Sequence, residues 1–120
     1  MGDEAWVEVE VTFIPESEGG RNQPPQNLNG NNYRPHLVIG DPAQRQARLI
    51  GNYIDEVMLG IGFTTGPDIV EAGRTYTATL QLAFYPHSAY KTVVPGATFT
   101  IREGAQIVAY GQVIARREAA

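Results

Sequence analysis

The chain has 120 residues, the size of one ordinary domain, and its 42% hydrophobic content excludes a disordered chain. It contains no cysteine, which excludes disulfides and thiolate metal sites and leads us to expect a cytoplasmic protein. A net charge of −4 argues against a general nucleic-acid binder, DNA included, and no apolar stretch approaches the roughly 20 residues of a membrane-spanning helix.

The N-terminal part predicts two strands separated by a long loop. Residues 6 to 13 alternate between apolar and polar side chains, which is typical of a strand with one buried face. Residues 15–32 are rich in Gly, Pro, Asn and Gln, so we expect a long surface loop within a single domain spanning residues 1–120. Residues 33 to 39 predict the second strand, which ends at Gly40-Asp41-Pro42.

The middle of the chain is less regular. Residues 44 to 55 fit a short strand or one amphipathic helical turn equally well. Residues 57 to 63 predict a strand with small residues on one face. Its other face is apolar and consists of Val57, Leu59, Ile61 and Phe63.

The C-terminal half predicts three further strands. Residues 75 to 85 alternate over the longest stretch of the chain, with Tyr76, Ala78, Leu80, Leu82 and Phe84 expected to face inward. Strands over residues 97–101 and 106–115 follow, joined by a turn at Glu103-Gly104. Six or seven strands without a long helix indicate an all-β sandwich or barrel.

Four short motifs carry a resemblance to a known family. They are Glu18-Gly19-Gly20-Arg21, Tyr33-Arg34-Pro35, Ile101-Arg102-Glu103-Gly104 and Gly111-Gln112-Val113. In their order, spacing and strand context they resemble the third, C-terminal domain of elongation factor Tu, over about residues 7 to 115. The resemblance implies a six-stranded antiparallel closed β-barrel.

The same resemblance implies a contact surface. In that family the third domain packs on the GTPase domain, contacts aminoacyl-tRNA and offers a surface to the nucleotide-exchange factor. By resemblance, the RNA- or partner-binding residues here are Arg21, Arg34, Arg102, Glu103 and Gly104. Guanidinium groups suit phosphates, a carboxylate accepts from a ribose 2′-hydroxyl, and glycine lets the backbone approach the sugar.

Departures from the family pattern leave the partner open. Asn22, Tyr85, Ala105 and Gln106 stand where the family has histidine, basic residues or glycine, so cations and donors are lost. The sequence also contains neither the GTPase domain nor the middle barrel. Three interpretations follow: a module that contacts tRNA or other structured RNA, a module that docks a protein of the translation machinery without RNA, and a remnant domain with no independent role.

The sequence does not predict an enzyme. His87 and Ser88 are adjacent, so their side chains diverge on an extended backbone, and no orienting acid is evident. His36 and His87 have no metal-ligand spacing to carboxylates. The glycine-rich stretch from Gly60 to Gly66 has its third glycine one residue late for a nucleotide loop. We therefore expect no catalytic residue, no cofactor and no metal.

Overall fold

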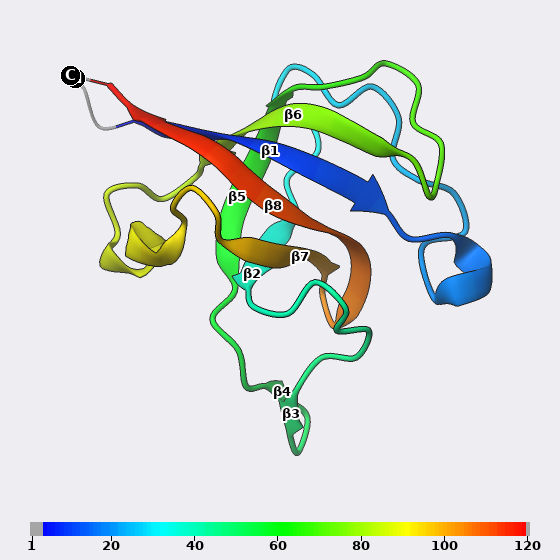
Figure 1. Cartoon of the computed structure of the whole chain (residues 1–120). Coiled ribbons are helices and arrows are strands. Elements are labelled where there is room, and N and C mark those ends of the chain that lie inside the picture. The colour runs from blue at the N-terminus through cyan, green and yellow to red at the C-terminus, as the bar shows by residue number, and fades with distance from the viewer. Residues whose placement is uncertain (1–3, 120) are drawn as a thin grey trace.

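The barrel topology follows from six antiparallel strands that close on themselves. The computed structural model describes residues 4–119, and it confirms the all-β, six-stranded closed barrel (Figure 1). The strand order is β1-β6-β5-β2-β7-β8, and β1 also pairs with β8. The strands are β1 (Ala5–Phe13), β2 (His36–Ile39), β5 (Leu59–Thr65), β6 (Thr75–Leu82), β7 (Thr98–Glu103) and β8 (Gln106–Glu118).

Strand β1 is paired along both edges, which closes the barrel. Val9 lies opposite Ala78 of β6 on one side and opposite Val113 of β8 on the other. The register with β8 shifts between Glu8 and Val9, a bulge of the kind that bends a sheet into a barrel. Val7, Val9 and Val11 are fully buried, and burial of each such side chain contributes about 1.5–3 kcal/mol.

One end of the barrel is filled by aromatic rings and by the loop that follows β1. The ring centroids of Tyr33 and Phe63 are 5.3 Å apart, and the Phe13 ring packs against both. Leu28, in the middle of the loop, is fully buried, and its backbone N–H donates to the Pro67 carbonyl at 3.0 Å.

The long loop over residues 15–32, which the sequence predicts to lie on the surface, also contributes a residue to the core. It contains no strand, as predicted, but it includes the 3₁₀ turn η1 (Glu16–Glu18), and Leu28 belongs to the core. Its last residues run beside β5, where the Asn31 N–H donates to the Phe63 carbonyl at 2.9 Å. One buried leucine among polar residues has no periodicity, which explains why the sequence pattern did not reveal this anchor.

The opposite end of the barrel is closed by the 3₁₀ turn η2 (Ser88–Thr92). Its Tyr90 is buried and donates from its hydroxyl to the Gly60 carbonyl at 2.6 Å, and Val93 just after the turn is also buried. Arg116 of β8 donates to the Tyr90 and Val93 carbonyls at 2.6 and 3.0 Å. Both helical segments of residues 4–119 are short 3₁₀ turns, and neither has the length or apolar content of a membrane span.

Two side chains expected to face the core are exposed. β6 ends at Leu82 and the chain turns over residues 83–87, so Phe84 leaves the strand and lies over Gly60 on the outside. β5 begins at Leu59, so Val57 precedes the strand and is also exposed. In both cases the alternation continues past the strand end in the sequence but not in the backbone.

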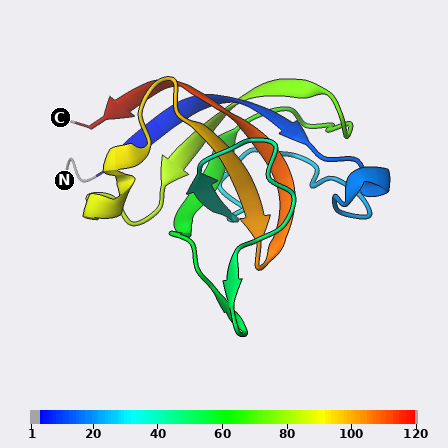
Figure 2. The same cartoon turned by 60° about the horizontal axis from the view of Figure 1, so that its bottom comes forward.

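Residues 41–58, which we call the arm, stand away from the barrel (Figures 1 and 2). The arm ends in a small hairpin made of β3 (Leu49–Ile50) and β4 (Tyr53–Ile54). Gly51 has φ +59 at the first turn position, where a tight hairpin favours glycine. Of the two predictions for residues 44 to 55, the strand is confirmed and the helical turn is wrong.

We predict that Gly111→Ala destabilises the barrel by about 2 kcal/mol, because an added Cβ has no room. Gly111 of β8 faces β1, and a Cβ there would collide with the Glu10 carbonyl and lie 2.8 Å from the Phe99 ring. Gly40 has open space and an ordinary φ, so Gly40→Ala is the control and should leave stability within about 0.5 kcal/mol. Urea unfolding measures both, and equal midpoints would contradict the prediction.

Candidate functional site

Two of the five predicted contact residues meet at the barrel rim beside the β7–β8 turn. The Glu103 carboxylate accepts from the Tyr33 hydroxyl at 2.5 Å and pairs with Arg21 Nε at 3.3 Å. The Arg21 guanidinium also lies 6.0 Å from the centroid of the Tyr33 ring. We call Arg21, Tyr33 and Glu103 the rim cluster. Three distant segments of the chain therefore converge here.

The rim cluster satisfies its own charges. One oxygen of Glu103 faces Arg21 and the other accepts from Tyr33, so a 2′-hydroxyl would have to compete for them. Burial raises the pKa of the Tyr33 phenol well above its ordinary value, and the hydrogen bond to Glu103 raises it further. The Tyr33 hydroxyl therefore keeps its proton, and remains a hydrogen-bond donor, over the whole physiological pH range.

Arg34 and Gly104 are exposed beside the rim cluster. Arg34 follows Tyr33 directly and takes part in no ion pair among residues 4–119. Gly104 forms the β7–β8 turn with φ +59, a backbone conformation that suits glycine. These two residues are the most exposed of the five, since Arg21 and Glu103 are half-buried and paired with each other.

Arg102, the fifth predicted contact residue, is not accessible to a ligand. Its side chain is 0% exposed and donates through both terminal nitrogens to Glu56, at 2.7 and 3.0 Å. Its Nε donates to Thr100 at 2.9 Å. Thr100 and Arg102 alternate with the core residues Phe99 and Ile101, so they lie on the outer face of β7, which the foot of the arm covers.

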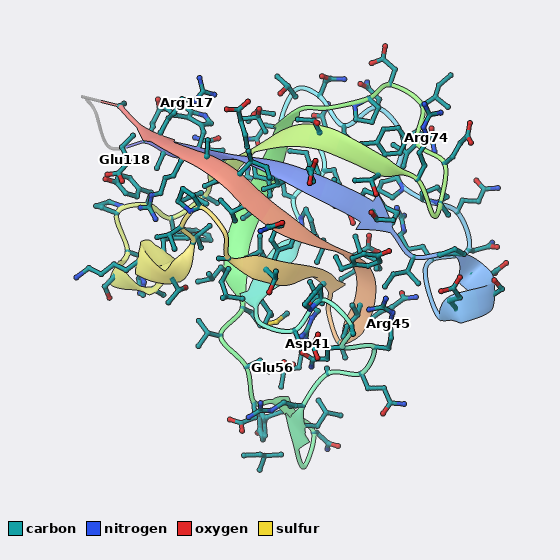
Figure 3. The ribbon with its side chains drawn as sticks, in the orientation of Figure 1. Asp41, Arg45, Glu56, Arg74, Arg117 and Glu118 are labelled. Carbon is teal, nitrogen blue, oxygen red and sulfur yellow. The ribbon has the colours of Figure 1, made fainter. Side chains whose placement is uncertain are left out.

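Glu56 fastens the arm to the barrel. Besides the two hydrogen bonds from Arg102, its carboxylate accepts from Gln44 Nε2 and from the Arg48 backbone N–H, each at 2.9 Å. The hydrogen bonds from Arg102 lower the pKa of Glu56 from 4.5 to about 2, against the opposing effect of burial. Both limbs of the arm are thus tied to β7 through one carboxylate. Figure 3 labels Glu56 near the point where the arm joins the barrel.

The far end of the arm is apolar and exposed. Tyr53 is 81% exposed, Ile50 64% and Leu49 54%. We call these three residues the tip. Sequence reasoning left this segment undecided, although the Gly51-Asn52 pair between two apolar dipeptides is a hairpin signal that would have found it. Glu56 carried no local signal, because its partner is 46 residues away.

The residues of conventional catalytic types are part of a turn or lie exposed on a strand. His87 Nδ1 accepts from the Ala89 backbone N–H at 3.1 Å, so this imidazole caps η2. Ser88 is the first residue of that turn, and His36 lies exposed on β2. Within residues 4–119, no group of three His, Asp or Glu side chains is placed to hold a metal ion.

The sequence has no match among protein-family models, and no curated protein matches it either. Function is therefore inferred from the rim cluster and the arm. The rim cluster offers a nearly neutral polar surface, whereas the arm offers an apolar one.

We predict that Glu56→Gln destabilises the protein by about 3 kcal/mol near neutral pH, since it leaves the Arg102 charge buried without its partner. The folded-state pKa lies below the unfolded one. The contribution of Glu56 is therefore complete above about pH 4.5 and is lost as the pH falls toward about 2.

Urea unfolding near neutral pH and again in acid measures this difference, which should shrink in acid. Glu16→Gln, on the exposed η1 turn, is the matched control and should change stability little. A Glu56→Gln loss of equal size at both pH values would contradict the ion-pair account.

Proposed function

We propose that this chain is a non-catalytic protein-interaction module that docks its partner through the arm. The observation that carries the proposal is the exposed apolar tip on an arm that is firmly fastened at its foot. Grouped exposed apolar side chains mark interaction sites, and tyrosine is enriched among the residues that dominate binding energy. The resemblance to the third domain of elongation factor Tu suggests a partner in the translation machinery.

The construction of the arm suits binding. The hydrogen bonds of Glu56 hold the two limbs in place, so little conformational entropy remains to be lost when a partner binds. The hairpin of β3 and β4 pairs only with itself among the described strands, so its outer edges offer backbone donors and acceptors. An extended segment of a partner can add to such an edge.

Contact with structured RNA is the second candidate, and the convergence at the rim favours it. Arg21, Tyr33 and Glu103 come together from remote segments, with Arg34 and Gly104 exposed beside them. Two observations place it second. Arg102 is withdrawn beneath the arm, and Arg21 is paired with Glu103, which leaves Arg34 as the cation of this surface without an ion pair. Phosphate binding depends on several unneutralised cations.

Photo-cross-linking tests the proposal directly. With a photoreactive amino acid in place of Tyr53, irradiation of living cells should give protein adducts of defined mass. The same amino acid in place of Ile69, which is 73% exposed but lies on a loop away from the arm, is the control and should give none. Adducts of equal yield at both positions, or no protein adduct at Tyr53, would contradict the proposal.

Titration with bulk tRNA at low and high salt separates the two candidates. For the protein-interaction module we expect no salt-sensitive binding in the micromolar range, because Arg102 is buried and Arg21 is paired, which leaves the rim surface with Arg34 as its cation without an ion pair. Micromolar binding that weakens steeply with salt and disappears in Arg34→Ala would instead establish the RNA surface. Lys91→Ala removes an exposed cation on η2, at the other end of the barrel, and serves as the matched control.

A further inference from the structure

A groove lies at the foot of the arm. It has a volume of about 560 Å³, and its walls come from the barrel, from η2 and from the arm itself. Val38 and Leu59 form its buried apolar floor, and Ala89 lines it from η2. The groove therefore accepts an apolar group, and it opens beside the arm on which the apolar tip is carried.

The chain thus presents an apolar projection and an apolar recess that are separated by part of one arm. In a two-fold symmetric pair, any contact from the first copy to the second is repeated from the second to the first. If two arms lie antiparallel, the tip of each copy reaches the foot of the other. A second copy of this chain therefore fills both features at once.

The charges near the middle of the arm are self-complementary. Arg48 and Asp55 precede β3 and follow β4, so they flank the same end of the hairpin, and the Asp55 N–H donates to the Arg48 carbonyl at 2.7 Å. Both line the groove, and neither forms an ion pair among residues 4–119. An axis at their level brings Arg48 of each copy to Asp55 of the other.

We propose that two copies of this chain associate through antiparallel arms, with each tip in the groove of the other copy. The inference rests on the proposed function, since it takes the arm to be the docking element, and it names a second copy as the occupant. Arg48 pairs with Asp55 across the axis, and the free edges of the two hairpins run alongside each other. The contact is confined to the arms and grooves, which predicts a dimer of modest affinity.

Sedimentation velocity of the full chain over a range of concentrations tests the pairing. The wild type should pass from monomer to dimer as concentration rises. Ile50→Asp should raise the dissociation constant by about 30-fold, because it places a charge in an apolar contact. Ile69→Asp changes a comparably exposed isoleucine outside the arm and should leave the dimer intact.

An exchange of charges tests the two-fold register. Arg48→Asp alone and Asp55→Arg alone place like charges across the axis, so each variant should be monomeric at concentrations where the wild type is dimeric. An equimolar mixture of the two should form the dimer again, since each new charge then faces its opposite. Circular dichroism melting of each variant verifies that it is folded, and both variants carry like charges within their own hairpin, so hairpin strain affects them similarly.

The outcomes separate this inference from the proposed function. A wild type that stays monomeric at every concentration overturns the dimer, as does a dimer that Ile50→Asp leaves unchanged. A mixture that fails to associate while the wild type does overturns the register. If the wild type is monomeric and the cross-linker at Tyr53 still captures a different protein, the occupant proposed here is wrong while the docking role of the arm stands.

Discussion

A buried guanidinium on the outer face of β7 fixes where the arm joins this barrel. An arginine remains charged at any physiological pH, so a side chain as enclosed as Arg102 is stable only with a carboxylate and further hydrogen-bond acceptors around it. Glu56 and Thr100 provide them, and Glu56 belongs to the arm. The position of the arm is therefore set by electrostatics at its foot. Its tip does not have to pack on the barrel, and apolar residues there are free to face solvent.

The two candidate surfaces differ in how they treat their polar and apolar groups. At the rim, Glu103 is engaged by Arg21 and Tyr33 within the same chain, so little unsatisfied charge is left for a ligand. On the arm, the apolar area of the tip has no partner within the described residues. Binding free energy comes largely from apolar surface that is exposed, and from charged or polar groups that have no partner, in the free protein. This contrast, rather than the overall charge, directs attention to the arm.

Much of the barrel could be predicted from alternation alone, because β1 and β6 each bury one face in the core and leave most of the other face at least partly exposed. Alternation could not decide between a sandwich and a barrel, since closure depends on pairing β1 with β8 from opposite ends of the sequence. It also failed at Phe84, where the pattern continues after the hydrogen-bonded ladder ends. The candidate site was harder to predict from the sequence than the barrel. The resemblance named Arg21 and Glu103 as contact residues, and the structure joins them in an ion pair, whereas the burial of Arg102 depends on Glu56, a carboxylate without a local sequence signal.

The two ends of the described chain lie side by side, and the Ala119 N–H donates to the Glu4 carbonyl at 2.9 Å. Figure 1 shows them at the upper left, whereas the arm points away at the bottom. A fold whose ends meet can be placed within a surface loop of a host protein without pulling that loop apart. The barrel is thus suited to insertion into a loop of another protein, and its arm would then point away from the point of insertion.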